Sequence, residues 1–199
     1  MSELILPLCV VGAALLVIAF WAVSVYNGLV ASRNRVKNAF SQIDVQLQRR
    51  HDLIPNLVET AKGFLKHERE TLQAVTEARD AARAAANAAA ADPTAAGAMA
   101  KLGAAEGLLG SALAGLRVVV EAYPNLKSDA HMASLMEELS STENKIAFAR
   151  QAYNDSVMSY NTARETFPAA LIAGAFGFSP CPQLEIETPE ARRNVKVSF

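Results

Sequence analysis

A long apolar run near the N-terminus, residues 4–25, constrains the fold of this chain more than any other feature. It reads LILPLCVVGAALLVIAFWAVSV, and Ser24 is its only polar residue. As a helix it would be about 33 Å long, enough to cross the hydrocarbon core of a bilayer. A cleaved signal peptide needs Lys or Arg before a shorter apolar core, whereas only MSE precedes this one. We therefore predict an uncleaved transmembrane anchor over residues 1–26.

Basic residues on one side of the run predict its orientation. Arg33, Arg35 and Lys37 follow the run, and no Lys or Arg precedes it. The positive-inside rule then places the N-terminus outside and the rest of the chain in the cytoplasm, as a single-pass protein of the plasma membrane. These three charges are those that any such anchor carries, and contact with anionic lipid adds only about 1 kcal/mol for each charge. The lipid bilayer is the first expected partner.

The remaining charge gives no sign of a nucleic-acid partner. The whole chain has a net charge of −1, and it has no basic excess or basic run interleaved with aromatic residues of the kind that binds nucleic acid. Cys9 lies inside the apolar run and Cys181 near the C-terminus, so we do not expect them to form a disulfide.

From residue 27 onward the apolar residues recur at helical spacing, which predicts an all-α fold. The clearest stripe consists of Met132, Leu135, Leu139, Ile146, Tyr153, Val157 and Tyr160. Four helices are expected, over residues 27–50, 53–90, 95–123 and 129–165. Their short connections favour an elongated antiparallel four-helix bundle over residues 27–178, with the fourth helix returning towards the membrane.

Three breaks separate these helices. DPTAAG at 92–97 and YPNLKSD at 123–129 are turns, and Ser128 or Asp129 can cap the helix that follows the second. The first break is predicted at Asp52, which would cap a new helix with Pro55 in its first turn. Because the apolar register also continues across Pro55, a kinked continuous helix is the alternative.

Three further segments carry weaker patterns. The alanine-rich residues 78–92 offer few packing groups and are expected at an exposed, distal end of a hairpin. FPAALIAGAFGF at 167–178 has no charge, and it can either cap the open end of the bundle or lie on the membrane surface. The tail, 179–199, contains three prolines and mixed charge, which predicts an extended or partly disordered segment.

No motif for chemistry is found: neither a metal-binding spacing, a phosphate loop nor a nucleophile with a base. We therefore expect no enzyme and no cofactor. What remains is a set of polar residues at positions that face the bundle. These are Asp44, Arg49, Arg50, Asn56 and Glu59 on the first two helices, and Glu143, Arg150, Asn154 and Asn161 on the last. They can line a ligand pocket; we favour buried ion pairs and amides that fix helix register.

Long segments of the chain resemble the bacterial LemA family. They are YNGLVASRNRVKNAFSQIDVQLQRRHDLIPNLVETAKGF at 26–64, LRVVVEAYPNLKSD at 116–129 and ENKIAFARQAYNDSVMSYNTARETFPAALIAGAFGF at 143–178. The resemblance implies a single-pass membrane protein with a bundle of long helices and no established enzymatic activity. Some relatives are associated with magnetosome membranes, and others are thought to act in membrane organisation or stress.

These observations together predict a membrane-anchored helical scaffold that self-associates or docks other membrane proteins at the bilayer. Two rival functions are open. A sensory or ligand-binding bundle would use the face from Glu143 to Asn161 as its pocket, and a membrane-associated enzyme would need a cleft with a perturbed acid or base.

Overall fold

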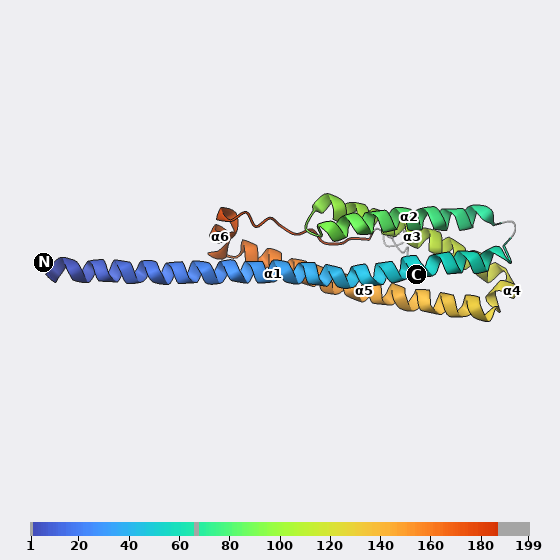
Figure 1. The fold of residues 1–199 in the computed structure, drawn as a ribbon, viewed down its shortest axis with the longest axis horizontal. Helices are drawn as coiled ribbons and strands as arrows, with labels where there is room; N and C mark the ends of the chain where they lie inside the picture. The colour runs from blue at the N-terminus through green and yellow to red at the C-terminus, as the bar shows by residue number, and fades with distance from the viewer. Residues whose placement is uncertain (1, 66–67, 187–199) are drawn as a thin grey trace, which may run out of the picture.

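The structure is a computed structural model that describes residues 2–65 and 68–186. Its described part is helical, without a β-strand, and α1 projects as a rod from a bundle of α1, α2, α3 and α5 (Figure 1). The helices are α1 (Ser2–Lys62), α2 (Arg69–Ala91), α3 (Ala96–Ala122), α4 (Pro124–Lys127), α5 (Ala130–Glu165) and α6 (Ala169–Ala175). Neighbouring long helices run antiparallel, and α5 returns towards the apolar end of α1. The predicted all-α bundle is confirmed.

The core of the bundle consists of two apolar clusters along its length. In the cluster nearer the apolar rod, Phe40 of α1 packs edge-on against Tyr153 of α5, with ring centroids 5.9 Å apart. In the other cluster, Leu57 of α1 joins Leu116 of α3 and Leu135 of α5. Each of these residues belongs to a stripe of residues three, four or seven apart, so one face of every long helix is buried.

We predicted a break in the first helix at Asp52, but the helix continues to Lys62. The predicted helices 27–50 and 53–90 are therefore wrong in their boundaries, and the alternative of one continuous helix is right. Ile54 and Leu57 are buried on the same stripe as Leu47, so ending the helix early would have exposed them. α1 ends at Lys62, and α2 begins at Arg69 and runs in the opposite direction (Figure 1).

Pro55 is accommodated because another helix supplies the hydrogen bond that it cannot make. Proline has no N–H, so the carbonyl four residues earlier, that of His51, lacks its helical donor. Arg79 of α2 donates its Nε–H to this His51 oxygen at 3.1 Å. This contact satisfies a buried carbonyl that would otherwise make the helix costly to continue.

The alanine-rich segment is a packing surface and not an exposed tip. Ala82, Ala86 and Ala89 are buried, because α2 runs back along α1 from Arg69 and packs against α3 as well. Alanine side chains allow close approach of the helices, and a row of them therefore forms a core face with little side-chain volume. The expectation of a distal, exposed end was wrong.

Both other predicted turns are present. The Asp129 carboxylate caps α5 by accepting a hydrogen bond from the Met132 N–H at 2.8 Å. At the α2–α3 turn, Asp92 Oδ1 accepts from the backbone N–H and the hydroxyl of Thr94, at 3.0 and 2.6 Å. These bonds satisfy donors that helix ends and turns leave free.

The C-terminal part packs further than we expected. Ala173 of α6 and Phe178 are buried against the bundle, so residues 167–178 do cap its open end. Residues 179–186, here called the strap, are extended and run from α6 back along the bundle (Figure 1). Cys181 and Leu184 in the strap are buried, so the packed chain extends past the predicted boundary at 178. Residues 187–199 lie outside the described residues.

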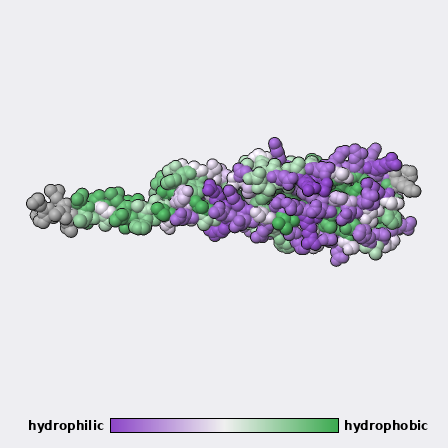
Figure 2. All heavy atoms as spheres, viewed as in Figure 1, coloured by the Kyte–Doolittle hydropathy of each residue, from purple (hydrophilic) through white to green (hydrophobic). Residues whose placement is uncertain are grey.

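The rod is the exposed apolar end of α1. Large side chains from Leu8 to Val23 are exposed, and Figure 2 shows this end as a hydrophobic projection beside a mainly hydrophilic bundle. By length and composition α3 could also cross a membrane, but it carries Glu106 and buries Leu102, Leu109 and Leu116 in the bundle core. The apolar end of α1 is thus the segment suited to a bilayer.

Candidate functional site

A cluster of charged side chains lies in the middle of the bundle, between the two apolar clusters. Arg50 of α1 forms ion pairs with Glu106 of α3 and, through Nη1 at 2.8 Å, with Glu143 of α5. The relative exposure of Arg50 is 3% and that of Glu106 is 2%. Removing one member of such a buried pair typically costs about 3–5 kcal/mol. The cluster therefore connects α1, α3 and α5 at one level of the bundle.

His51 completes this cluster in its neutral form. Its Nε2 lies 3.5 Å from Glu106 Oε1, and the side chain is 1% exposed. Burial, followed by the positive charges of Arg50, Arg79 and Arg83, lowers the pKa of His51 from 6.5 to about 4. Glu106 favours the protonated ring, but Arg50 already neutralises its carboxylate, so burial decides the charge state.

The second polar site is a ladder of two asparagines that binds the strap. Asn161 Nδ2 donates to the Cys181 carbonyl at 2.9 Å, and the Cys181 N–H donates to Asn161 Oδ1 at 3.0 Å. Seven residues earlier on α5, Asn154 makes the same two contacts with Leu184. Its Nδ2 donates to the Leu184 carbonyl at 3.3 Å, and its Oδ1 accepts from the Leu184 N–H at 2.9 Å. Each amide matches the donor and the acceptor of one residue in an extended backbone. Because only backbone atoms are bonded, α5 recognises the conformation of the segment.

Two tyrosines reinforce the ladder. The Tyr160 hydroxyl donates to the Ser179 carbonyl at 2.9 Å. The Tyr153 hydroxyl lies between the carbonyls of Pro182 at 2.9 Å and Pro93 at 3.1 Å, which joins α5, the strap and the α2–α3 turn. Burial raises the pKa of Tyr153 far above its usual value, so its hydroxyl remains a donor.

On its other side the strap contacts α3 at Gly103. A Cβ atom placed on this glycine would overlap the backbone carbonyl of Glu185. The groove between α3 and α5 therefore has one wall without a side chain, where the strap backbone approaches the helix.

The structure separates the nine predicted polar residues into three groups. Arg50 and Glu143 meet in the buried charge cluster, and Asn154 and Asn161 bind the strap. Arg49 pairs with Glu138 at the surface, with a distance of 2.6 Å. The others are apart from both sites: Asp44 accepts from Gln48 at 3.4 Å, Glu59 pairs with Lys62 at 2.8 Å, Asn56 is exposed, and Arg150 has no ion pair with a described residue.

The three membrane-proximal basic residues have different environments. The Arg33 guanidinium lies 5.3 Å from the ring centroid of Phe178, so this charge also anchors the chain just before the strap. Arg35 and Lys37 are exposed. Arg35 donates to the Ser32 hydroxyl at 3.2 Å.

Sequence reasoning missed Glu106, His51 and the role of the two tyrosines. Glu106 could have been found as an isolated acid in the middle of an apolar helix. The dipeptide Tyr-Asn occurs at 153–154 and again at 160–161, and this repeat with a spacing of seven places two tyrosine–asparagine pairs on one face of α5. The strap itself gave no periodic pattern that could have revealed its packing.

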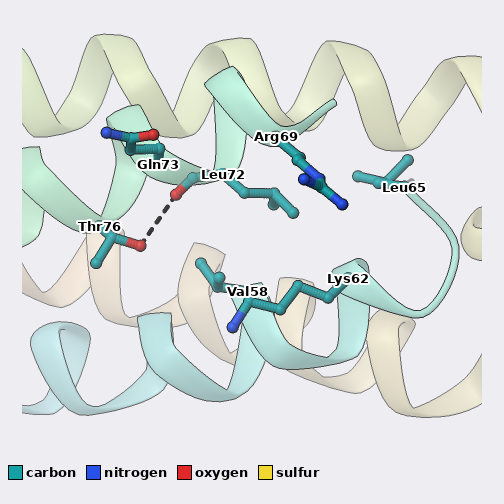
Figure 3. A pocket seen from close by; sticks show the side chains of 7 residues that line it. All are labelled: Val58, Lys62, Leu65, Arg69, Leu72, Gln73 and Thr76. Carbon is teal, nitrogen blue, oxygen red and sulfur yellow. Dashed lines mark hydrogen bonds between the residues drawn. The ribbon is translucent and has the colours of Figure 1, made fainter. Parts of the chain in front are cut away.

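A cavity lies elsewhere, between the far ends of α1 and α2 (Figure 3). Its volume is about 610 Å³, and it is lined by Val58, Lys62, Leu65, Arg69, Leu72, Gln73 and Thr76. The side chains of Val58 and Lys62 face Leu72 and Arg69 across the opening. An apolar floor with two positive charges suits an anionic amphiphile. The cavity is separate from the face between Glu143 and Asn161, where the ligand pocket was expected and where the strap occupies the asparagines.

Comparison with known proteins decides the family. The model of the LemA family matches residues 39–199. The chain belongs to the LemA family. A magnetosome protein, MamQ of Magnetospirillum gryphiswaldense, is 28% identical over 168 residues, which cover 77% of this chain and 62% of the relative. MamQ 2 of Paramagnetospirillum magneticum is 29% identical over 184 residues, covering 83% of this chain and 67% of the relative.

The match defines what this LemA-family chain shares with these relatives. It spans 62% of the length of the first MamQ protein. Membership agrees with a membrane-associated helical protein, and neither the family description nor the names of these relatives states an enzymatic activity.

Proposed function

We propose that this protein is a membrane-anchored scaffold that self-associates or docks other membrane proteins at the bilayer. The observation that carries the proposal is the continuity of α1, which runs from Ser2 to Lys62 without interruption. One helix of about 90 Å thus belongs both to the apolar rod and to the bundle. A bundle connected in this way cannot swivel freely on a linker, so it presents its surfaces at a fixed angle to the membrane.

Two further features support this function. The absence of Lys and Arg before the apolar run, with Arg35 and Lys37 exposed after it, favours a cytoplasmic bundle at the inner membrane. The relatives are named magnetosome proteins, and we propose that this chain likewise acts at a membrane. In this scheme the buried charge cluster and the strap keep the bundle rigid.

Cross-linking in native membranes tests the scaffold. Cys9 and Cys181 are replaced by alanine, and single cysteines are introduced at exposed positions: Leu108→Cys, Val118→Cys and Phe148→Cys. We expect at least one to give a cross-linked product that mass spectrometry identifies as a second copy or another membrane protein. Leu109→Cys is the matched control, because Leu109 is buried and should not react. Monomer at every position, also with a lysine-directed reagent, would contradict the proposal.

The cavity in Figure 3 favours a second candidate function, binding of an anionic amphiphile. The probe is anilinonaphthalene sulfonate added to the full chain in non-ionic detergent. We expect Arg69→Gln with Lys62→Gln to weaken its fluorescence titration several-fold, and Lys101→Gln, at an exposed position on α3, to leave it unchanged. Equal titrations for both variants would exclude the cavity as the binding site.

A further inference from the structure

The face of α6 that points away from the bundle is apolar and uncovered. Ala173 and Phe178 pack inwards, whereas Phe167, Leu171 and Phe176 are 79%, 65% and 63% exposed. Residues 167–178 contain no charged side chain. Three large apolar side chains exposed to solvent on such a short segment indicate a surface that a partner covers.

The position of α6 along α1 indicates which partner this is. The Tyr26 ring contacts the rings of Phe176 and Phe178, with centroids 5.1 and 5.5 Å apart. Tyr26 follows directly on the apolar run at 4–25, so α6 lies beside the end of the predicted membrane span. In Figure 2 the hydrophobic surface of the rod continues onto the swelling at its base, and the hydrophilic surface begins beyond it.

Lipid fits this surface by continuity and by composition. A surface that begins where a membrane span ends lies at the depth of the headgroups, where Tyr and Trp rings are enriched. Aromatic and leucine side chains there can enter the acyl boundary without carrying a charge into it. The tyrosine contacts also hold α6 against α1, so its apolar face has a defined depth.

We propose that Phe167, Leu171 and Phe176 insert into the interfacial region of the bilayer as a second membrane contact. The inference rests on the proposed anchoring of α1. With α1 as one attachment and α6 as another beside it, the bundle can neither rotate about the anchor nor move away from the surface. Because the strap continues from α6, the lipid contact is connected to the groove between α3 and α5.

Depth-dependent fluorescence quenching tests this contact in the full chain reconstituted into phosphatidylcholine vesicles. Trp21 is the only tryptophan, so Trp21→Phe gives a silent background. Phe176→Trp is the reporter. Phe148→Trp is the matched control, because Phe148 is 73% exposed on α5 and lies beyond the Phe40–Tyr153 contact, more than about 20 Å from Tyr26 along α1.

We expect brominated lipids to quench Phe176→Trp at least threefold more than Phe148→Trp, and aqueous iodide to show the reverse order. Leu171→Ser in the reporter background should reduce the lipid quenching, and Met158→Ser, at an exposed position on α5, should not. The native Trp21 reports separately on insertion of α1.

Two results would overturn the inference while leaving the anchor in place. In the first, Trp21 is quenched by brominated lipid but Phe176→Trp behaves like Phe148→Trp, so α6 faces water. In the second, Phe176→Trp is protected from both quenchers in proportion to protein density, so a second copy covers α6. Loss of lipid quenching at Trp21 itself would contradict the anchored scaffold as well.

Discussion

Pro55 shows how one residue depends on a contact from another helix. Without an N–H at position 55, the His51 carbonyl lies inside α1 with no donor of its own helix, and Arg79 supplies one. His51 is the other residue whose state depends on its surroundings, because burial keeps its ring neutral. His51 lies beside Arg50 and contacts Glu106 in the buried charge cluster, so a change in its charge affects the centre of the bundle.

A double-mutant cycle measures the Pro55–Arg79 contact. Arg79→Met should lower the free energy of unfolding by about 1.5–3 kcal/mol, because a charged donor to a buried carbonyl is lost. In a Pro55→Ala background the restored N–H donates to the His51 carbonyl instead. Arg79→Met should then lower the free energy of unfolding by at least about 1 kcal/mol less than it does in the wild type. Arg83→Met, at an exposed position one turn later, is the control. Equal costs in both backgrounds would show that Arg79 does not compensate for the proline.

The neutral state of His51 predicts that the bundle loses stability in mild acid. Its pKa is about 4 in the folded state and about 6.5 when unfolded, so the unfolded chain binds the proton first as pH falls. Above pH 6.5 the protonation of His51 does not lower the free energy of unfolding. Between pH 6.5 and pH 4 it lowers the free energy of unfolding by up to about 3 kcal/mol. Asp44 has a raised pKa because of burial, and it acts in the opposite direction.

Unfolding in urea at pH 7.5 and at pH 4.5, followed by circular dichroism in detergent, gives the measurement. His51→Gln should show a smaller loss between the two pH values than the wild type. His131→Gln should retain the wild-type loss, because His131 is exposed. A His51→Gln variant with the same loss as the wild type would mean that other groups cause the acid sensitivity.

Among the elements, the strap has the least regular structure, and it contacts both α5 and α3. It lies between α5 and α3, with backbone bonds to Asn154 and Asn161 on one side and contact with Gly103 on the other. Its backbone thus fills the space that a helix face would otherwise occupy. Cys181 is buried within it, and burial raises the pKa of this thiol.

Gly103→Ala should displace the strap, because the new Cβ would overlap the Glu185 carbonyl. In a Cys9→Ala background we expect Cys181 to react with maleimide several-fold faster in this variant than in the wild type. Gly110→Ala on the same helix is the matched control, since a Cβ there meets no atom within 4 Å and alanine favours the helix by about 1 kcal/mol. Equal labelling of the two variants would show that the strap does not depend on Gly103.

At the scale of the whole molecule, a single helix joins the apolar rod to the bundle. α5 then runs back towards the base of the rod, near Tyr26. The part of α1 near Tyr26 and the segment that contains α6 meet there. The side of the membrane on which the bundle lies then determines which partners it can meet.

Topology is tested with single cysteines in a Cys9→Ala, Cys181→Ala background, because the buried native Cys181 is a slow reporter. We expect Asn144→Cys, at an exposed position on α5, to be protected from a membrane-impermeant maleimide in spheroplasts until lysis. Ser2→Cys should label before lysis. The reverse result would place the bundle outside and favour a sensory function over the scaffold.

The sequence alone determined the apolar span, the helical content and the turns at 92–97 and 123–129. It also narrowed the cap of α5 to Ser128 or Asp129, of which the structure shows Asp129. These features depend on neighbouring residues, through periodicity and end-group bonding, so a local pattern is sufficient to find them. The sequence also placed Asn154 and Asn161 on one face of α5, but it did not show what they bind.

Only the tertiary structure decided that α1 continues through Pro55, that Glu106 opposes Arg50, and that the strap fills the groove. In each case the deciding contact joins residues far apart in the chain: Arg79 with His51, α3 with α1, Leu184 with Asn154. A proline normally ends a helix, and a segment with prolines and mixed charge normally stays free. A proline inside a helix costs about 3 kcal/mol, and here the hydrogen bond from Arg79 together with the burial of Ile54 and Leu57 offsets that cost. The strap is held in place by its backbone hydrogen bonds to Asn154 and Asn161.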